Sequence, residues 1–250
     1  MPGVKCPQNS QALFCIAKTS SFIVKLILLK KILPLLLLCP LFALQSCFDV
    51  IEDISLNANG SGSFKLTLNM SRSRTKINSL MKMKTVNGHD VPTKEEIKNK
   101  TAGIERTIKS TAGISNVKTT LDFDNFIATV TCNFSNVGCL NNAVKNINTK
   151  ENNSQPGIEK HYEYDAAAKT FSRLNKFSLK DEYNKLSVAD REIFETAAYT
   201  GIFRFKNEVA GATNKESKTA ANKKAVMLKQ NALDIITNKK SIENKITLVK

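Results

Sequence analysis

The residue best placed for a covalent reaction is Cys47, which lies between an apolar segment and a polar one. A lysine-containing stretch precedes thirteen uncharged residues, Ile32–Leu44, and Ser46 stands directly before the cysteine. A membrane-spanning helix needs about 20 apolar residues, so this run is too short to cross a bilayer. Pro34 and Pro40 would also disrupt such a helix. Positive charge, a short apolar core and a small residue, in this order, are typical of a cleaved export signal.

The four residues Leu44-Gln45-Ser46-Cys47 resemble the lipobox of bacterial lipoproteins. The resemblance implies that the Cys47 thiol receives a diacylglycerol, that the chain is cut between Ser46 and Cys47, and that the new amine is acylated, for example by palmitate. Two or more acyl chains hold a protein stably on a membrane, because each buried methylene contributes about 0.8 kcal/mol. Phe48 occupies the place of the aspartate that retains lipoproteins in the inner membrane. The resemblance therefore implies the outer membrane of a bacterial envelope.

Two other interpretations of residues 1–46 stay open. One is an ordinary signal peptide whose removal leaves Cys47 as a plain cysteine, and the other is a short uncleaved anchor. The region before the apolar core is longer than export requires, so we expect translation to begin nearer residues 22–28. The sequence thus predicts a signal peptide over 1–46 and a single domain over 47–250. The polar, proline-containing stretch 149–157 is the best boundary between subdomains.

The predicted mature chain is strongly basic. Residues 1–46 contain five lysines and no acidic residue, so residues 47–250 keep a net charge of +10 from the +15 of the whole chain. A basic surface favours a polyanionic partner, although it is also compatible with a lysine-rich coat that only aids solubility. Tryptophan is absent and aromatic residues make up 7% of the chain, which argues against a site that stacks bases or sugars. Outside the cytoplasm we expect anionic lipid, lipopolysaccharide or acidic glycan as the partner, and no nucleic acid.

Few other residues offer chemistry. After Cys47 only Cys132 and Cys139 remain, and an oxidising compartment would allow a disulfide between them; two buried free thiols are the alternative. The two histidines are His89 and His161. We expect His161 on a solvated strand face with Glu163, and we expect adjacent carboxylates such as Glu52-Asp53 to be surface acids.

Known catalytic and ligand motifs are missing. The chain has no HExxH zinc motif, EF-hand loop, Rossmann fingerprint or P-loop, and no Gly-x-Ser-x-Gly elbow. We therefore expect no metal, no cofactor and no enzyme activity. The leading hypothesis is a non-enzymatic binding domain with an apolar groove rimmed by lysines. The alternatives are a structural or assembly subunit that docks another envelope protein and, less favoured, a hydrolase that uses His161 or buried carboxylates.

The elements that would position these residues follow from the hydrophobic periodicity. Alternating apolar residues predict hairpins, and spacings of three and four predict amphipathic helices. Thr93 and Glu96 form a capping-box pattern at the start of one helix. Hairpins are expected over 48–70, 114–134 and 161–174, helices over 73–84, 93–112, 136–147 and 187–198, strands over 199–206, 224–230 and 244–249, and an exposed loop over 214–224. This order predicts an α+β fold in which an antiparallel sheet of hairpins has helices packed on one face.

Overall fold

The computed structural model describes residues 48–150, 160–175 and 178–249. The larger of its sheets has seven strands in the spatial order β11 (Lys218–Thr219), β12 (Ala225–Asn231), β9 (Ala198–Phe205), β1 (Asp49–Leu56), β2 (Gly62–Asn69), β6 (Ile127–Phe134) and β5 (Ile114–Asp122). A second sheet has four strands in the order β10 (Val209–Ala212), β13 (Asn244–Leu248), β8 (Thr170–Arg173) and β7 (Tyr162–Asp165). A small hairpin pairs β3 (Thr85–Val86) with β4 (His89–Asp90).

Helices occupy the connections between these strands. They are α2 (Arg74–Leu80), which follows the short 3-10 helix η2 (Ser71–Ser73), α3 (Lys94–Lys109), α4 (Val137–Lys150), α5 (Lys180–Lys185), α6 (Val188–Glu195) and α7 (Ala232–Ile236). The capping box predicted for α3 is confirmed: Thr93 Oγ1 accepts a hydrogen bond from the Glu96 backbone N–H at 3.2 Å, and a Glu96 carboxylate oxygen accepts one from the Thr93 N–H at 2.7 Å. Among the described residues, no helix is both long and apolar enough to cross a bilayer.

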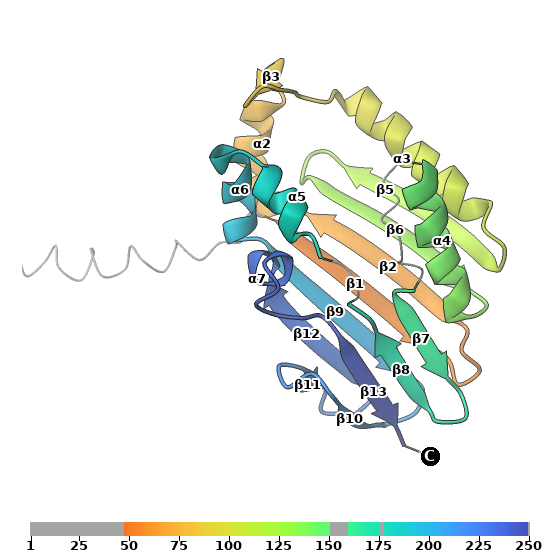
Figure 1. The fold of residues 1–250 in the computed structure, drawn as a ribbon. Coiled ribbons are helices and arrows are strands. Elements are labelled where there is room, and N and C mark those ends of the chain that lie inside the picture. The colour runs from red at the N-terminus through yellow and green to blue at the C-terminus, as the bar shows by residue number, and fades with distance from the viewer. Residues whose placement is uncertain (1–47, 151–159, 176–177, 250) are drawn as a thin grey trace, which may run out of the picture. The chain divides into compact units, whose positions relative to one another are not determined.

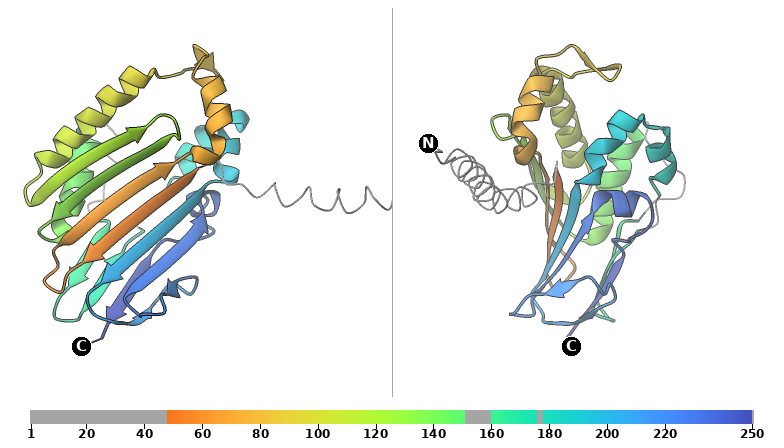
Figure 2. Two further views of the ribbon diagram at one scale, coloured as in Figure 1. Left: turned by 180° about the vertical axis from the view of Figure 1, so that it is seen from behind. Right: turned by 90° about the vertical axis from the view of Figure 1, so that its left-hand side faces the viewer.

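The layers confirm the α+β class and refine it. Helices α3 and α4 cover one half of a face of the seven-stranded sheet, and the four-stranded sheet covers the other half of the same face (Figure 1). Helix α4 contacts both β6 and β7, so it joins the two halves of this layer. No described helix or sheet packs across the opposite face, as the view from behind shows (Figure 2). The covering layer is thus only partly helical.

The predicted hairpins are confirmed, but the sheet is not purely antiparallel. β1 pairs with β2, β5 with β6, and β7 with β8, all antiparallel. β1 also pairs with β9, and this pairing is parallel. Its partners lie far apart in sequence, so no local pattern could reveal it. The stretch 214–224, expected as a loop, contains the short strand β11.

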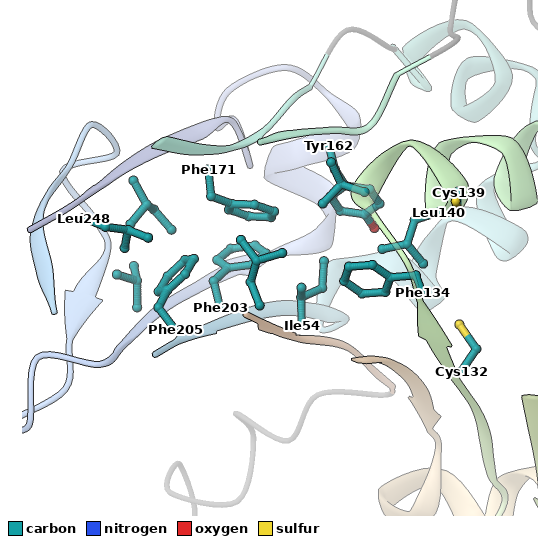
Figure 3. Close-up of a cluster of buried hydrophobic side chains, with 14 of the residues drawn as sticks. Ile54, Cys132, Phe134, Cys139, Leu140, Tyr162, Phe171, Phe203, Phe205 and Leu248 are labelled. Atoms are coloured by element: carbon teal, nitrogen blue, oxygen red, sulfur yellow. The ribbon is translucent and has the colours of Figure 1, made fainter. Parts of the chain in front are cut away.

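The hydrophobic core lies between the seven-stranded sheet and its covering layer. Phe171 from β8 is fully buried, and its ring centroid lies 5.3 Å from that of Phe203 and 5.8 Å from that of Phe205 on β9. Ile54 from β1 and Leu140 from α4 extend the same cluster toward the helical half (Figure 3). This cluster thus extends under both halves of the covering layer.

Candidate functional site

Most of the predicted sites do not come together in the structure. Cys47 and Ser46, with the rest of the predicted signal peptide, lie outside the described residues, and so does most of the expected boundary at 149–157. Thr149 and Lys150 at its start belong to α4. Within the described ranges, no group of three or more His, Cys, Asp or Glu residues lies close enough to hold a metal ion.

The two cysteines are separate buried thiols in the structure, and no disulfide joins them. Cys132 points from β6 into the core, where burial raises the pKa of its thiol to about 11. Cys139 lies in the first turn of α4, and its Sγ atom is 3.3 Å from the Ser135 hydroxyl. It fills space left by Gly113, where an added Cβ would come within 2.4 Å of that sulfur. Although the two cysteines are close in sequence, their sulfur atoms lie in different environments (Figure 3).

His89 does not act with its sequence neighbour Asp90. Its Nε2 atom lies 3.3 Å from an Asp190 carboxylate oxygen at the start of α6. Asp190 also accepts hydrogen bonds from Asn87 at 3.1 Å and from the Ser187 hydroxyl at 2.7 Å. These hydrogen bonds tie the β3–β4 hairpin to α6. In a catalytic triad the serine contacts the histidine, whereas in these hydrogen bonds His89 and Ser187 both contact the Asp190 carboxylate, so the group is not arranged as a triad.

His161 is half-buried, so the prediction of a solvated strand face is wrong for this residue. Its backbone N–H donates to the side-chain oxygen of the buried Asn141 at 2.9 Å, which fixes the start of β7 against α4. Burial and, to a lesser extent, the nearby Arg173 guanidinium lower the pKa of His161 to about 4. Glu163 remains near the surface, where it pairs with Lys160 at 3.5 Å.

The lowered pKa of His161 predicts that the protein loses stability as the pH falls. The unfolded imidazole has a pKa of about 6.5, above the folded value of about 4, so between these values the unfolded chain binds more protons than the folded one. The contribution is complete above about pH 6.5 and is lost as pH falls toward 4. Urea unfolding of a His161→Gln variant should show a smaller loss of stability over this range than the wild type. A His89→Gln variant should keep the loss, and equal slopes for all three proteins would contradict the assignment.

A buried ion pair joins the two sheets, and the sequence did not reveal it. Glu52 on β1 is 3% exposed and Arg173 on β8 is 6% exposed, which corrects the expectation that Glu52 is a surface acid. The Arg173 Nε–H donates to both Glu52 carboxylate oxygens, at 3.1 and 3.2 Å. The Tyr199 hydroxyl donates to the same carboxylate at 3.1 Å, and the Arg173 guanidinium lies 4.9 Å from the Tyr162 ring centre.

The electrostatics of this cluster keep the Arg173 guanidinium charged. Burial opposes the charge on Arg173, but the Glu52 carboxylate together with the Tyr162 and Tyr199 hydroxyl groups outweighs it and raises the pKa of the guanidinium. Burial, and next the Glu52 charge, raises the pKa of the Tyr199 hydroxyl well above its ordinary value, so the phenol stays a neutral donor. Both carboxylate oxygens accept hydrogen bonds from within the protein. The cluster is therefore suited to holding the two sheets together.

Several elements meet at one end of the seven-stranded sheet, the end at which β1 begins, which we call the Phe48 end. Asp49, the first residue of β1, pairs with Asn69, the last of β2, and with Ala198, the first of β9. Because η2 and α2 follow β2 and α6 precedes β9, these helices lie at this end (Figure 2). The β5–β6 turn lies there too, since Asn69 also pairs with Ile127, the first residue of β6.

An open basic pocket of about 510 Å³ lies at the Phe48 end, between α2, the start of α3 and the β5–β6 turn. Three bases and three hydroxyl or amide side chains dominate its lining, which consists of Arg74, Thr75, Asn78, Ser79, Lys82, Lys94, Phe123 and Asp124. The Lys94 ammonium lies 5.4 Å from the centre of the Phe123 ring, which helps to hold it over the pocket. Cationic groups beside hydroxyl and amide donors suit a phosphate, carboxylate or sulfate group that carries sugar or glycerol hydroxyls.

The sequence contains a pattern from which this basic pocket could have been predicted. Residues 54–89 contain six basic residues and no acidic one. Five of these bases lie on what we call the α2 segment, residues 71–92, and they are Arg72, Arg74, Lys76, Lys82 and Lys84. Two of these five bases, Arg74 and Lys82, line the pocket.

Two further hollows each have two basic residues in their lining, against three bases and Asp124 in the pocket at the Phe48 end. One of about 440 Å³ at the opposite end of the sheet includes Arg204 and Lys206, but Arg204 already pairs with Asp53 at 3.1 Å. The other, of about 340 Å³, lies between α3 and α4, with Ile104 and Ile147 in its lining and Arg106 and Lys150 beside them. It is the feature nearest to the apolar groove with a basic rim expected from the sequence, but it lies between two helices and not between helices and sheet.

No protein-family model matches the sequence, and no curated protein matches it either. Among solved structures, the domain is similar to the folded domain of the Mycobacterium tuberculosis protein LppM, determined by NMR. The TM-score is 0.39 with 10% sequence identity, and the match covers 82% of this chain and 92% of that chain. A likeness at this level carries no conclusion about function.

Proposed function

We propose that the chain is a lipoprotein of the bacterial envelope, held on the outer membrane by acyl chains on Cys47, and that its domain is a non-enzymatic binding module. Its ligand is an anionic lipid or an anionic glycan such as lipopolysaccharide, and the basic pocket binds the anionic group. Arg74, Lys82 and Lys94 supply the positive charge. The Thr75 hydroxyl and the Asn78 amide beside them donate hydrogen bonds to the rest of the headgroup.

The observation that carries this proposal is the position of the basic pocket at the Phe48 end. Cys47 is bonded directly to Phe48, so a lipid on its thiol leaves the domain at this end of the sheet. Phe48 packs against Phe194 of α6, with ring centroids 6.1 Å apart. The proposed anchor and the pocket with three bases therefore share one end of the domain, where anionic headgroups would be concentrated.

The proposed lipid anchor is tested by replacing the sulfur atom of Cys47 with oxygen. A Cys47→Ser variant should lose labelling by a palmitate analogue and should move from the membrane fraction to the soluble or unprocessed fraction. A Cys139→Ser variant, which removes a buried thiol, should keep the label. Labelling of Cys47→Ser at the wild-type level would contradict the lipid anchor.

The ligand class is tested by vesicle flotation of the unlipidated chain that begins at Phe48, which contains the whole described core. Binding to phosphatidylglycerol vesicles should exceed binding to phosphatidylcholine vesicles. The double variant Arg74→Gln/Lys94→Gln should weaken the anionic binding roughly 30-fold, because each basic residue near an anionic surface contributes about 1 kcal/mol. Lys206→Gln/Lys224→Gln, which removes the same charge near the opposite end of β9, should change it little. Equal binding to both vesicle types would exclude this ligand class.

A further inference from the structure

Large apolar side chains are exposed in an uneven pattern on the described surface. Val188 is 76% exposed and Met83 is 55% exposed, the two highest values among the described large apolar residues. Ile193 and Leu179 are exposed as well. Met83 lies on the α2 segment, Val188 and Ile193 lie on α6, and Leu179 directly precedes α5. These elements stand at the Phe48 end (Figure 2).

The two most exposed residues lie on elements that are tied together. Met83 lies in the turn between α2 and β3, and Val188 is the first residue of α6. Asp190 of α6 receives the hydrogen bonds from Asn87 and His89 of the β3–β4 turn and strand described above. The hairpin and α6 are therefore held side by side at the Phe48 end.

Charge divides this end into two sides. Lys82 and Lys84 flank Met83 and are both exposed. Acidic residues predominate on α5 and α6, which together contain five acidic and three basic residues. An anionic surface would thus attract the α2 side and not the α5–α6 side, and Met83 is the apolar residue on the attracted side.

We propose that the Phe48 end is a membrane-docking surface, on which Met83 enters the headgroup region of an anionic bilayer while Lys82 and Lys84 contact lipid phosphates. This inference rests on the proposed lipid anchor at Cys47. No linker separates that residue from the folded domain, because Phe48 already packs on Phe194 and its carbonyl accepts a hydrogen bond from the Ala198 N–H. A lipid on Cys47 must therefore bring this end of the domain against the bilayer.

The arrangement of Met83 between two lysines also supports an anionic bilayer as the partner of this surface. An apolar side chain between two lysines can enter the boundary between headgroups and acyl chains while the ammonium groups stay among the phosphates. The basic pocket opens at the same end, so docking through Met83 would also place Arg74 and Lys94 near headgroups. The docking surface and the pocket thus form one anion-facing side of the domain.

The test uses the full lipidated chain in vesicles that contain phosphatidylglycerol. An environment-sensitive fluorophore is attached to a Met83→Cys variant and, as the matched control, to a Met227→Cys variant. Met227 is also an exposed methionine, 40% accessible, but it lies on β12. The two described cysteines are buried, so the introduced thiol takes the label. Quenching by nitroxide-bearing lipids should be at least about threefold stronger at position 83 than at position 227, and aqueous iodide should quench in the reverse order.

Charge reversal then tests the electrostatic part. When Lys82→Glu and Lys84→Glu are introduced into the labelled Met83→Cys variant, lipid quenching at position 83 should fall to the level at position 227. Equal quenching at the two positions overturns the docking surface, and so does shielding of position 83 in detergent without vesicles, which would indicate a protein partner or a second copy. The mass of the chain reports acylation of Cys47 separately. Loss of acylation therefore counts against the proposed anchor, whereas equal quenching with acylation intact counts against the docking surface alone.

Discussion

An Arg173→Leu variant should lose about 3–5 kcal/mol of unfolding free energy, because the substitution leaves the Glu52 carboxylate buried without its cation. Glu52 and Arg173 lie on different sheets, so their ion pair acts at the contact between the two layers. The Tyr199 hydroxyl still donates to the carboxylate, but a single neutral donor does not replace the charge. Urea unfolding of the purified protein measures the loss.

The chain offers a matched control on the same strand. Asp53, the neighbour of Glu52, pairs with Arg204, whose side chain is 51% exposed. Arg204→Leu should cost less than about 1 kcal/mol, as is usual for an exposed pair. The double variant Glu52→Leu/Arg173→Leu should recover much of the loss, since replacing both members of a buried pair by apolar residues is often close to neutral. If Arg173→Leu and Arg204→Leu have similar effects, the buried pair does not stabilise the contact between the sheets.

A Phe171→Ala variant should lose about 3–5 kcal/mol, because it removes a fully buried ring and leaves a cavity in close-packed surroundings. Phe171 lies on the short strand β8 and contacts the rings of Phe203 and Phe205 on the opposite layer. The four-stranded sheet should therefore loosen first. Hydrogen exchange of β8 and β13 amides, together with the urea midpoint, measures both effects.

Two further variants serve as controls for the Phe171→Ala variant. Phe171→Leu keeps most of the apolar volume and should lose clearly less stability than the alanine variant. Val188→Ala removes an apolar side chain that is 76% exposed and should leave the urea midpoint nearly unchanged. A small loss for Phe171→Ala would mean that the four-stranded sheet is not packed through this ring.

The sequence predicted the parts of the fold that depend on local patterns. Alternation of apolar residues identified the β1–β2, β5–β6 and β7–β8 hairpins, and the Thr93–Glu96 pair located the start of α3. The parallel pairing of β1 with β9 and the separation of the strands into two sheets depend on contacts between distant segments. Tyr199 and Glu52, which meet across these strands, are 147 positions apart, and periodicity carries no information at that range.

The same limit explains the errors at individual residues. Glu52 was expected at the surface because adjacent acids usually are, and only the distant Arg173 makes its burial favourable. His161 was expected to be solvated because its neighbours are polar, but α4 packs against the start of its strand through Asn141. The basic pocket was within reach of the sequence, since the absence of acids over residues 54–89 is visible there. Its position at the Phe48 end follows only from the strand register.

The central place of β1 has a consequence for when the sheet can form. Synthesis delivers the amino end first, so β1 and β2 can pair early, but β9 completes the other side of β1 only after most of the chain has been made. Pairing between such distant segments is slow, because a long loop must close before the contact forms. The middle of the sheet therefore closes late, once β9 has been made and can pair with β1.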